Sequence, residues 1–412
     1  MAGEGAAVDP AVLRAGLRAA RRRAQARAAL LVAPLFVFLL LSFVGPIGSL
    51  LLRGISDHEV TGVLPRTVAA LGAWSGAGLP SDSTFAALVE DMREAYAAGT
   101  LAPAATRLNY DVNGFRTLMF GTARRLRDLG EGNPREALVA LDPKWGERET
   151  WAAIARARGP LTDLYLLAAV DLRRDEANRI AAAPDDQAVF RAILGRTFWI
   201  ALVVTLTCLL VGFPVAYLLA SLPPQRANLL LVFVLLPFWT SLLVRTTAWV
   251  VLLQREGIVN SALLGLGLIE APLRMIFNRF AVYVAIVYVL LPFMILPLYG
   301  VMRAIPAVHL RAAASLGARP WVVFRRIYLP QALPGVGAGV LLVFIQALGY
   351  YITPALVGGA DDQMISYFIA FYAGRTVNWG MAGALSLLLL VATSTMFALF
   401  RRLGGLERLG VR

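Results

Sequence analysis

The residue types that carry out covalent chemistry are sparse in this sequence. Its only lysine, Lys144, lacks the preceding glycine frame with which a Walker A loop cradles phosphate. The two histidines, His58 and His309, are far apart, and the single cysteine, Cys208, lies inside an apolar run. A disulfide or a thiolate metal site within one chain is therefore excluded. The sequence predicts no catalytic residue, no metal site, no cofactor held by this chain and no ATPase site of its own.

A basic, amphipathic segment at 305–330 stands between two long apolar runs. Pro306 suits the first turn of a helix because its missing N–H would be unpaired there, and Gly317 can adopt the left-handed conformation that ends a helix. Together they predict two short helices with a bend. Three residues at a spacing of four share one thin face of the first helix, namely Val308, Ala312 and Leu316. Such a face can approach another backbone closely.

Polar residues also interrupt two of the apolar runs. Arg245, followed by Trp249, lies inside one of them, and an arginine at membrane depth is costly unless it faces protein or water. It either lines a pathway or pairs two helices, or else it extends outward to the membrane surface. Tyr350, Tyr351 and Thr353 interrupt another run near its end, as a gate or as an aromatic belt at a helix end. These five residues are the candidates for a translocation path.

Composition assigns the chain to the membrane. Its 412 residues have a mean hydropathy of +0.66, and 58% are hydrophobic while only 16% are charged, which is too apolar for a soluble domain. The net charge of +13 comes from arginines beside apolar runs, without an aromatic-interleaved basic patch. We therefore expect an integral membrane protein in contact with lipid, and no nucleic acid as a partner.

Six apolar runs are each long enough to cross a hydrocarbon core about 30 Å thick. They cover residues 29–53, 198–222, 229–253, 281–302, 333–357 and 381–400. The sequence thus predicts a basic N-terminus at 1–28, a first transmembrane helix at 29–53 and a polar insertion at 54–196. The remaining predicted domains are a membrane core at 197–405, which contains a cytoplasmic loop at 304–330, and a tail at 406–412.

Charge sets the predicted orientation. Arginines gather in the N-terminus, in the 305–330 segment and in the tail, while the loops at 254–280 and 358–380 carry acids. The positive-inside rule therefore puts both termini in the cytoplasm and the insertion outside the cell. Helical patterns dominate the insertion, at 84–98, at 103–129 with a break at Asn113-Gly114, at 147–158 and at 161–183. The predicted fold class is an all-α integral membrane protein.

The order of residues in the 305–330 segment resembles the cytoplasmic EAA coupling loop of ABC-importer permeases. The matching positions are Ala312, Ala313, Gly317, Ile327, Leu329 and Pro330. Arg311 stands where that family usually has Glu, which puts the acidic contact of the family in doubt. Further segments, at 236–249, 257–260, 353–359 and 378–380, resemble permeases of the spermidine/putrescine importer family. The resemblance covers about 190–405, and the insertion lies outside it.

This resemblance implies a type I permease with six transmembrane helices in the bacterial inner membrane. Such a subunit pairs with a second permease, docks two cytoplasmic ATPase subunits that bind the ATP, and receives substrate from an extracytoplasmic binding protein. The six matching residues would couple the ATPases to transport. The substrate would be a polyamine or a related solute such as an opine, an organic phosphonate or an iron chelate. An ion-coupled secondary transporter and a membrane-anchored sensor or scaffold are the alternatives from other classes.

Overall fold

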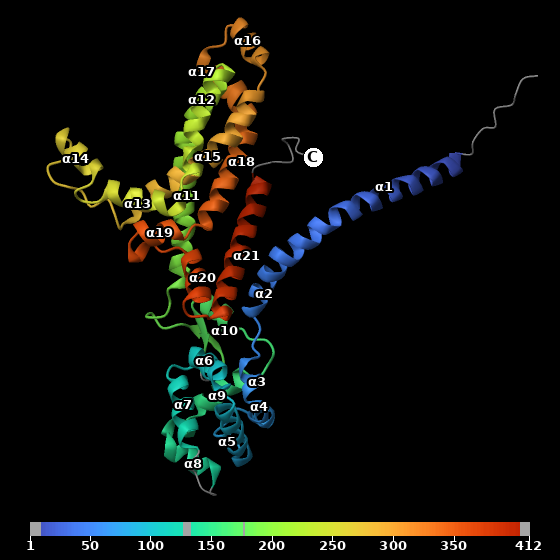
Figure 1. Ribbon diagram of the computed structural model, residues 1–412, viewed down its shortest axis with the longest axis vertical. Coiled ribbons are helices and arrows are strands. Elements are labelled where there is room, and N and C mark those ends of the chain that lie inside the picture. Colours follow the sequence, from blue (N-terminus) through green and yellow to red (C-terminus); the bar gives the residue numbers. More distant parts are fainter. Residues whose placement is uncertain (1–9, 127–132, 176–177, 404–412) are drawn as a thin grey trace, which may run out of the picture.

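The computed structural model describes residues 10–126, 133–175 and 178–403. The molecule is elongated: a bundle of long helices carries the 305–330 segment at one end and the insertion at the opposite end (Figure 1). Helix α1 (Pro10–Leu39) leaves the body on one side, while α13 (Leu242–Leu253) and α14 (Ile258–Gly265) project on the other. The predicted tail at 406–412 and the first nine residues lie outside the described residues.

Three long helices form the centre of the bundle. They are α11 (Phe190–Ser221), α15 (Arg279–Ala304) and α18 (Leu329–Leu348), and α15 packs against both of the others. Apolar residues on the facing sides are fully buried, among them Ile200, Val204, Met294 and Val343. The apolar runs of the sequence therefore pack against each other in this centre. Two of its helices, α15 and α18, flank the 305–330 segment.

The first and last long helices lie outside this centre. After α1, a π-helical turn (Leu40–Val44) leads into α2 (Gly45–Arg53). Together they form the candidate span Arg23–Arg53, and no residue in its most apolar 18-residue stretch is buried. At the other end of the chain, α21 (Trp379–Leu403) packs against α20 (Ile365–Gly374) and α2. The apolar surface of α1 thus faces away from the rest of this chain, as a lipid-facing or partner-facing helix does.

The predicted span at 229–253 is not one straight helix. It consists of α12 (Pro224–Leu235), a 3₁₀ turn (Leu236–Trp239) and α13 (Leu242–Leu253), which continues to α14 (Ile258–Gly265). The two arms meet at 96°. The Ser241 hydroxyl accepts a hydrogen bond from the N–H of Val244 and so begins a new helix. Among the described residues five helices can each cross a membrane, or six if this bent pair is one span.

The run predicted at 333–357 also differs from one continuous helix. Its helical path begins earlier, with α17 (Pro320–Val323) and a π-helical turn (Phe324–Tyr328), and α18 ends at Leu348. Short helix α19 (Ile352–Val357) and a 3₁₀ turn (Ala360–Asp362) follow. The predicted loop at 358–380 contains α20, a short apolar helix that packs on α21.

The insertion forms a separate helical body. Its helices are α3 (Glu59–Val63), α4 (Pro65–Ala70), α5 (Asp82–Ala97), α6 (Leu101–Asp111), α7 (Phe115–Arg125), α8 (Pro134–Leu141), α9 (Arg148–Arg156) and α10 (Leu164–Ala169), with 3₁₀ turns at Leu71–Ala73 and Pro143–Gly146. Trp145 and Trp151 are fully buried at its centre, with Phe85 and Phe115 against them. The predicted break at Asn113-Gly114 separates α6 from α7, while 127–129 lies outside the described residues.

The prediction of a continuous helix over 161–183 is wrong. Only α10 is helical there, and an antiparallel hairpin of β1 (Leu172–Arg174) and β2 (Ile180–Ala182) follows it. Asp171 and Asn178 have positive φ values of 56° and 60°, which a continuous helix does not allow. The chain therefore reverses here, and apart from this hairpin and an isolated bridge between Ser56 and Leu161 the described residues form no strand.

Close contacts join the insertion to the bundle. Helices α2 and α21 cross at Gly54 and Gly383, where a Cβ on Gly383 would lie 2.3 Å from the Leu50 carbonyl oxygen, so only glycine fits. The buried Asp171 carboxylate accepts hydrogen bonds of 2.8 Å from the N–H groups of Phe190 and Arg191, at the start of α11. These contacts attach the insertion to the ends of two membrane helices.

A buried ion pair reinforces the same junction. Arg107 on α6 reaches Asp57, just after α2, at 2.6 Å, and each side chain is only 1% exposed. The Arg107 guanidinium also lies 5.6 Å from the ring centroid of Tyr165 on α10. The buried cluster of Asp57, Arg107 and Tyr165 therefore connects the insertion with the end of the first membrane helix and with α10, which precedes the hairpin.

Candidate functional site

The 305–330 segment folds as two short helices joined at Gly317. Helix α16 (Ala307–Ser315) ends where the N–H of Gly317 bonds to the carbonyl of Ala314 and the N–H of Ala318 to that of Ala313. This is the Schellman arrangement, and Gly317 supplies the left-handed conformation that it needs, with φ of 80°. Pro320 then occupies the first position of α17. The local sequence signals therefore account for the bend.

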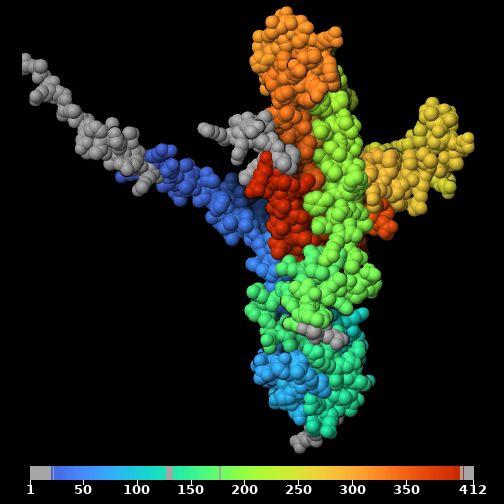
Figure 2. All heavy atoms as spheres, turned by 180° about the vertical axis from the view of Figure 1, so that it is seen from behind, coloured from blue at the N-terminus to red at the C-terminus, as the bar shows by residue number. Residues whose placement is uncertain are grey.

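The thin face predicted on α16 is turned away from the rest of the chain. Val308 is 57% exposed and Leu316 is 89% exposed, and Ala312 is exposed between them. Ala313 is instead buried against the body, with Leu310 half-buried beside it. The segment forms the extreme tip of the molecule (Figure 2). An apolar face of this kind at one end of the molecule is available to another protein.

Aromatic rings connect this tip to the membrane helices. Trp321, Phe324 and Tyr328 stack in succession, with ring centroids 5.7 and 6.0 Å apart. Tyr217 near the end of α11 meets both Phe324 and Tyr328 edge to face, at 6.2 and 5.2 Å. The half-buried Ile327 and Leu329 continue this path into α18, and Pro330 is exposed. A displacement of the tip would thus press on both α11 and α18.

Hydrogen bonds add to this connection. Arg303, at the end of α15, donates to the carbonyls of Ala220 and Leu222 at 3.0 Å, and so satisfies the free carbonyls at the end of α11. His309 Nδ1 lies 3.1 Å from Gln331 Oε1, which joins α16 to α18. The tip therefore contacts α11 and α18, and Arg303 fixes the end of α15 against the end of α11.

The surface of the tip is basic. Arg311, Arg319, Arg325 and Arg326 are all exposed, and none forms an ion pair within the described part of the chain. Sequence 304–330 contains no acid. Since Arg311 replaces the glutamate typical of coupling loops, a protein that binds this tip should present acidic or neutral groups there.

The candidates for a translocation path come from two neighbouring elements. Arg245 and Trp249 lie on α13, which packs against α19, the helix that holds Thr353. Tyr350 and Tyr351 directly precede α19. The structure therefore gathers these residues in one region of the bundle, although they are about a hundred positions apart in the sequence.

The Arg245 side chain is half-buried. Its Nε and Nη1 atoms are buried and have no hydrogen-bond partner among the described residues. The Thr353 hydroxyl is likewise buried and unpartnered. Trp249 packs edge to face on Tyr288 of α15 at 5.6 Å, whereas Tyr351 is 40% exposed. Both sequence interpretations of Arg245 therefore stay predictions.

Sequence reasoning missed the aromatic stack and the buried junction. The spacing of Trp321, Phe324 and Tyr328, three and four residues apart, does place them on one helical face. Their partner Tyr217, however, lies on another helix. The pair of Asp57 and Arg107 is separated by fifty positions, and no local pattern links them.

Comparisons with known proteins agree with the resemblance found in the sequence. Residues 197–404 match the family model of the binding-protein-dependent transport system inner membrane component. The spermidine/putrescine transport system permease protein PotB of Salmonella typhimurium (strain LT2) is 34% identical over 249 residues, which cover 59% of this chain and 87% of that protein. Its Escherichia coli (strain K12) counterpart is 38% identical over 202 residues, covering 49% and 74%.

Solved structures also resemble this chain. One is the crystal structure of a bacterial alginate ABC transporter in complex with an alginate pentasaccharide-bound periplasmic protein. A chain of that structure aligns with 15% sequence identity and a TM-score of 0.46, over 52% of this chain and 78% of that one.

Proposed function

The chain belongs to the family of binding-protein-dependent transport system inner membrane components, as a type I ABC-importer permease. From this premise we propose that it couples ATP hydrolysis by separate subunits to the import of a small organic solute. Family membership leaves the secondary-transporter and sensor interpretations without support. The observation that carries the coupling proposal is the exposed face of α16, with Leu316 89% exposed at the tip of the molecule.

In this proposal the tip receives motion from the ATPases. Two cytoplasmic ATPase subunits bind ATP, and one of them binds the face of α16 around Ala312 and Gly317. When the ATPase dimer closes, the tip is displaced and presses through the stack of Phe324 and Tyr328 on α11 and α18. The permease then changes between inward-open and outward-open states. The residues that position the binding face of α16 from behind are Ala313, Ile327, Leu329 and Pro330.

The proposed substrate is a polyamine or a related small organic solute. This follows from the relatives, which are named as spermidine/putrescine permeases. The chain has no acid in its predicted spans that would bind a cation directly. We therefore propose that an extracytoplasmic binding protein performs most of the selection, and that Arg245, Trp249, Tyr350, Tyr351 and Thr353 contribute to the path.

A second permease subunit completes the proposed transporter in the bacterial inner membrane. Both termini and the tip would lie in the cytoplasm. The insertion, at the opposite end of the bundle, would then lie outside the cell, where it can contact the binding protein (Figure 1).

Cysteine labelling tests this orientation. The native Cys208 is buried, so the background is low. We expect Arg124→Cys, at an exposed site in the insertion, to react with a membrane-impermeant maleimide in intact spheroplasts. The exposed Arg311→Cys should react only after permeabilisation. The opposite pattern of labelling would reverse the proposed topology.

A further inference from the structure

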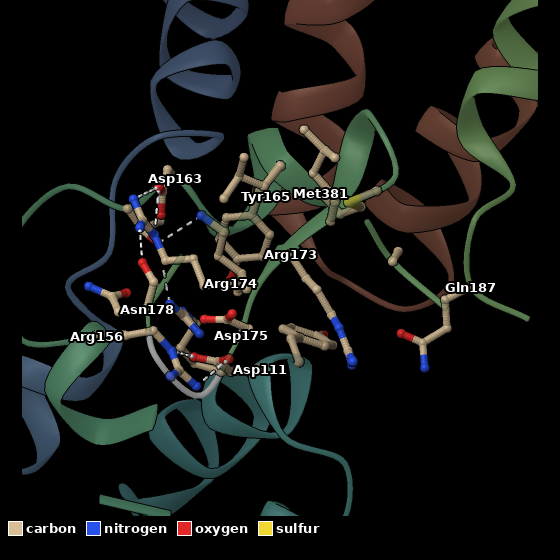
Figure 3. A pocket seen from close by; sticks show the side chains of 18 of the residues that line it. Asp111, Arg156, Asp163, Tyr165, Arg173, Arg174, Asp175, Asn178, Gln187 and Met381 are labelled. Atoms are coloured by element: carbon tan, nitrogen blue, oxygen red, sulfur yellow. Dashed lines mark hydrogen bonds and ion pairs between the residues drawn. The ribbon is translucent and has the colours of Figure 1, made fainter. Parts of the chain in front are cut away.

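A cleft of 1530 Å³ lies where the insertion meets the membrane helices, at the end of the bundle away from the coupling tip. The walls come from α6, α9 and α10, from the β1–β2 hairpin, and from Phe190 of α11, Tyr372 of α20 and Met381 of α21. Figure 3 shows its charged side chains gathered around the hairpin. This volume is larger than most small-molecule sites require. None of the translocation candidates on α13 and α19 lines this cleft.

The charges in the walls are mostly neutralised. Seven arginines and five acids line the cleft. Four arginines have carboxylate partners, in the pairs Arg156 with Asp111, Arg174 with Asp163, Arg179 with Asp175, and Arg107 with Asp57 behind the wall. Arg148 and Arg158 donate instead to the backbone carbonyls of Gly76 and Leu71. One arginine remains.

That arginine is Arg173, in the middle of β1. It is exposed, and within the described residues its guanidinium makes no hydrogen bond or ion pair. Glu149 and Asp186 also line the cleft, but neither is within ion-pair distance of Arg173. The side-chain amide of Gln187 is likewise exposed and unbonded, and both side chains extend without a marked interaction in Figure 3. Two unused sets of N–H donors therefore line the same cleft.

Aromatic rings line the same cleft. Phe190 follows Gln187 by three positions and contacts Tyr372 at 6.3 Å. Tyr165 and Tyr110 also line the cleft, and their ring centroids lie 6.4 Å apart. The Tyr165 phenol is neutral at physiological pH, and burial raises its pKa further, so it does not repel an anion. The cleft thus combines apolar ring surfaces with a free guanidinium.

We propose that this cleft is a binding site for a small organic anion with a carboxylate group. The fork of the Arg173 guanidinium matches a carboxylate in two parallel hydrogen bonds, to which Gln187 can add a further donor. The rings of Phe190 and Tyr372 cover the apolar part of the ligand. This site goes beyond the transport function and does not depend on the identity of the transported solute.

Calorimetric titration of the purified full-length protein with citrate tests the proposal. We expect saturable binding that weakens about tenfold or more in Arg173→Gln, because a charge-assisted bidentate contact is lost. Arg124→Gln removes the same charge from an exposed site of the insertion outside the cleft, and it should bind citrate like the wild type. Gln187→Ala should weaken binding severalfold and provides a second variant if Arg173→Gln unfolds.

Spermidine serves as the cationic counterpart in the same titration. Absence of saturable citrate binding, equal binding by the wild type and Arg173→Gln, or displacement of citrate by spermidine would each overturn the proposal. Because binding is measured without ATPases or uptake, this result is independent of whether the transport proposal holds.

Discussion

Replacing Gly317 with tryptophan is expected to abolish co-purification of the ATPase subunits and ATP-driven uptake, while the protein still inserts into the membrane. The φ of Gly317 is 80°, a conformation that tryptophan strongly resists. The bonds from Ala318 to Ala313 and from Gly317 to Ala314 depend on that conformation. A Cβ here has no atom within 4 Å, so the indole would project into the space where a partner binds.

Gly317→Asn is the matched control. Asparagine tolerates the left-handed conformation better than other residues and carries a much smaller side chain. We expect this variant to retain ATPase binding and uptake within about twofold of the wild type, since asparagine also occurs at the left-handed position that ends a helix. Normal co-purification and uptake by Gly317→Trp would refute the role of the tip in docking.

Asp57→Ala is expected to destabilise the folded insertion by about 3–5 kcal/mol, because removing one member of a buried pair leaves the other charge uncompensated. Both Asp57 and Arg107 are 1% exposed, so water cannot replace the lost carboxylate. The same pair joins the end of α2 to the insertion, and its loss should therefore also loosen the junction. Circular dichroism of the purified protein during denaturation measures the change in free energy of unfolding.

Asp163→Ala provides the comparison for this experiment. Its ion pair with Arg174 has a similar distance, but the side chains are 46% and 31% exposed. Pairs that are accessible to solvent contribute about 0–1 kcal/mol, so this variant should remain close to the wild type in stability. Equal destabilisation by the two substitutions would mean that burial does not determine the contribution of the Asp57 pair.

Local sequence patterns predicted the architecture where short-range physics determines it. The spacing of Val308, Ala312 and Leu316 predicted a shared face on α16, and Gly317 and Pro320 predicted the bend. The break at Asn113-Gly114 likewise separates two helices. In each case the determining groups lie within a few residues of one another, so the sequence contains the whole signal.

The differences arise where distant parts of the chain decide the local conformation. Hydropathy is continuous across Thr240-Ser241 and therefore did not predict the 96° bend. The helical pattern at 161–183 did not reveal the reversal at Asp171, whose carboxylate caps α11 nineteen positions away. The contact of Tyr217 with Phe324 and Tyr328, and the cleft at Arg173, depend on tertiary packing that no local pattern contains.

Photo-crosslinking from position 316 tests the central claim most directly, that the tip of α16 binds an ATPase subunit. Leu316 is 89% exposed, and Leu161, 68% exposed in the insertion, is the matched control at the opposite end. A photoreactive amino acid is placed at each position in cells that express the complete transporter. We predict that position 316 forms a crosslink to the ATPase and position 161 does not. A crosslink to the ATPase from position 161 but not from position 316 would contradict the account.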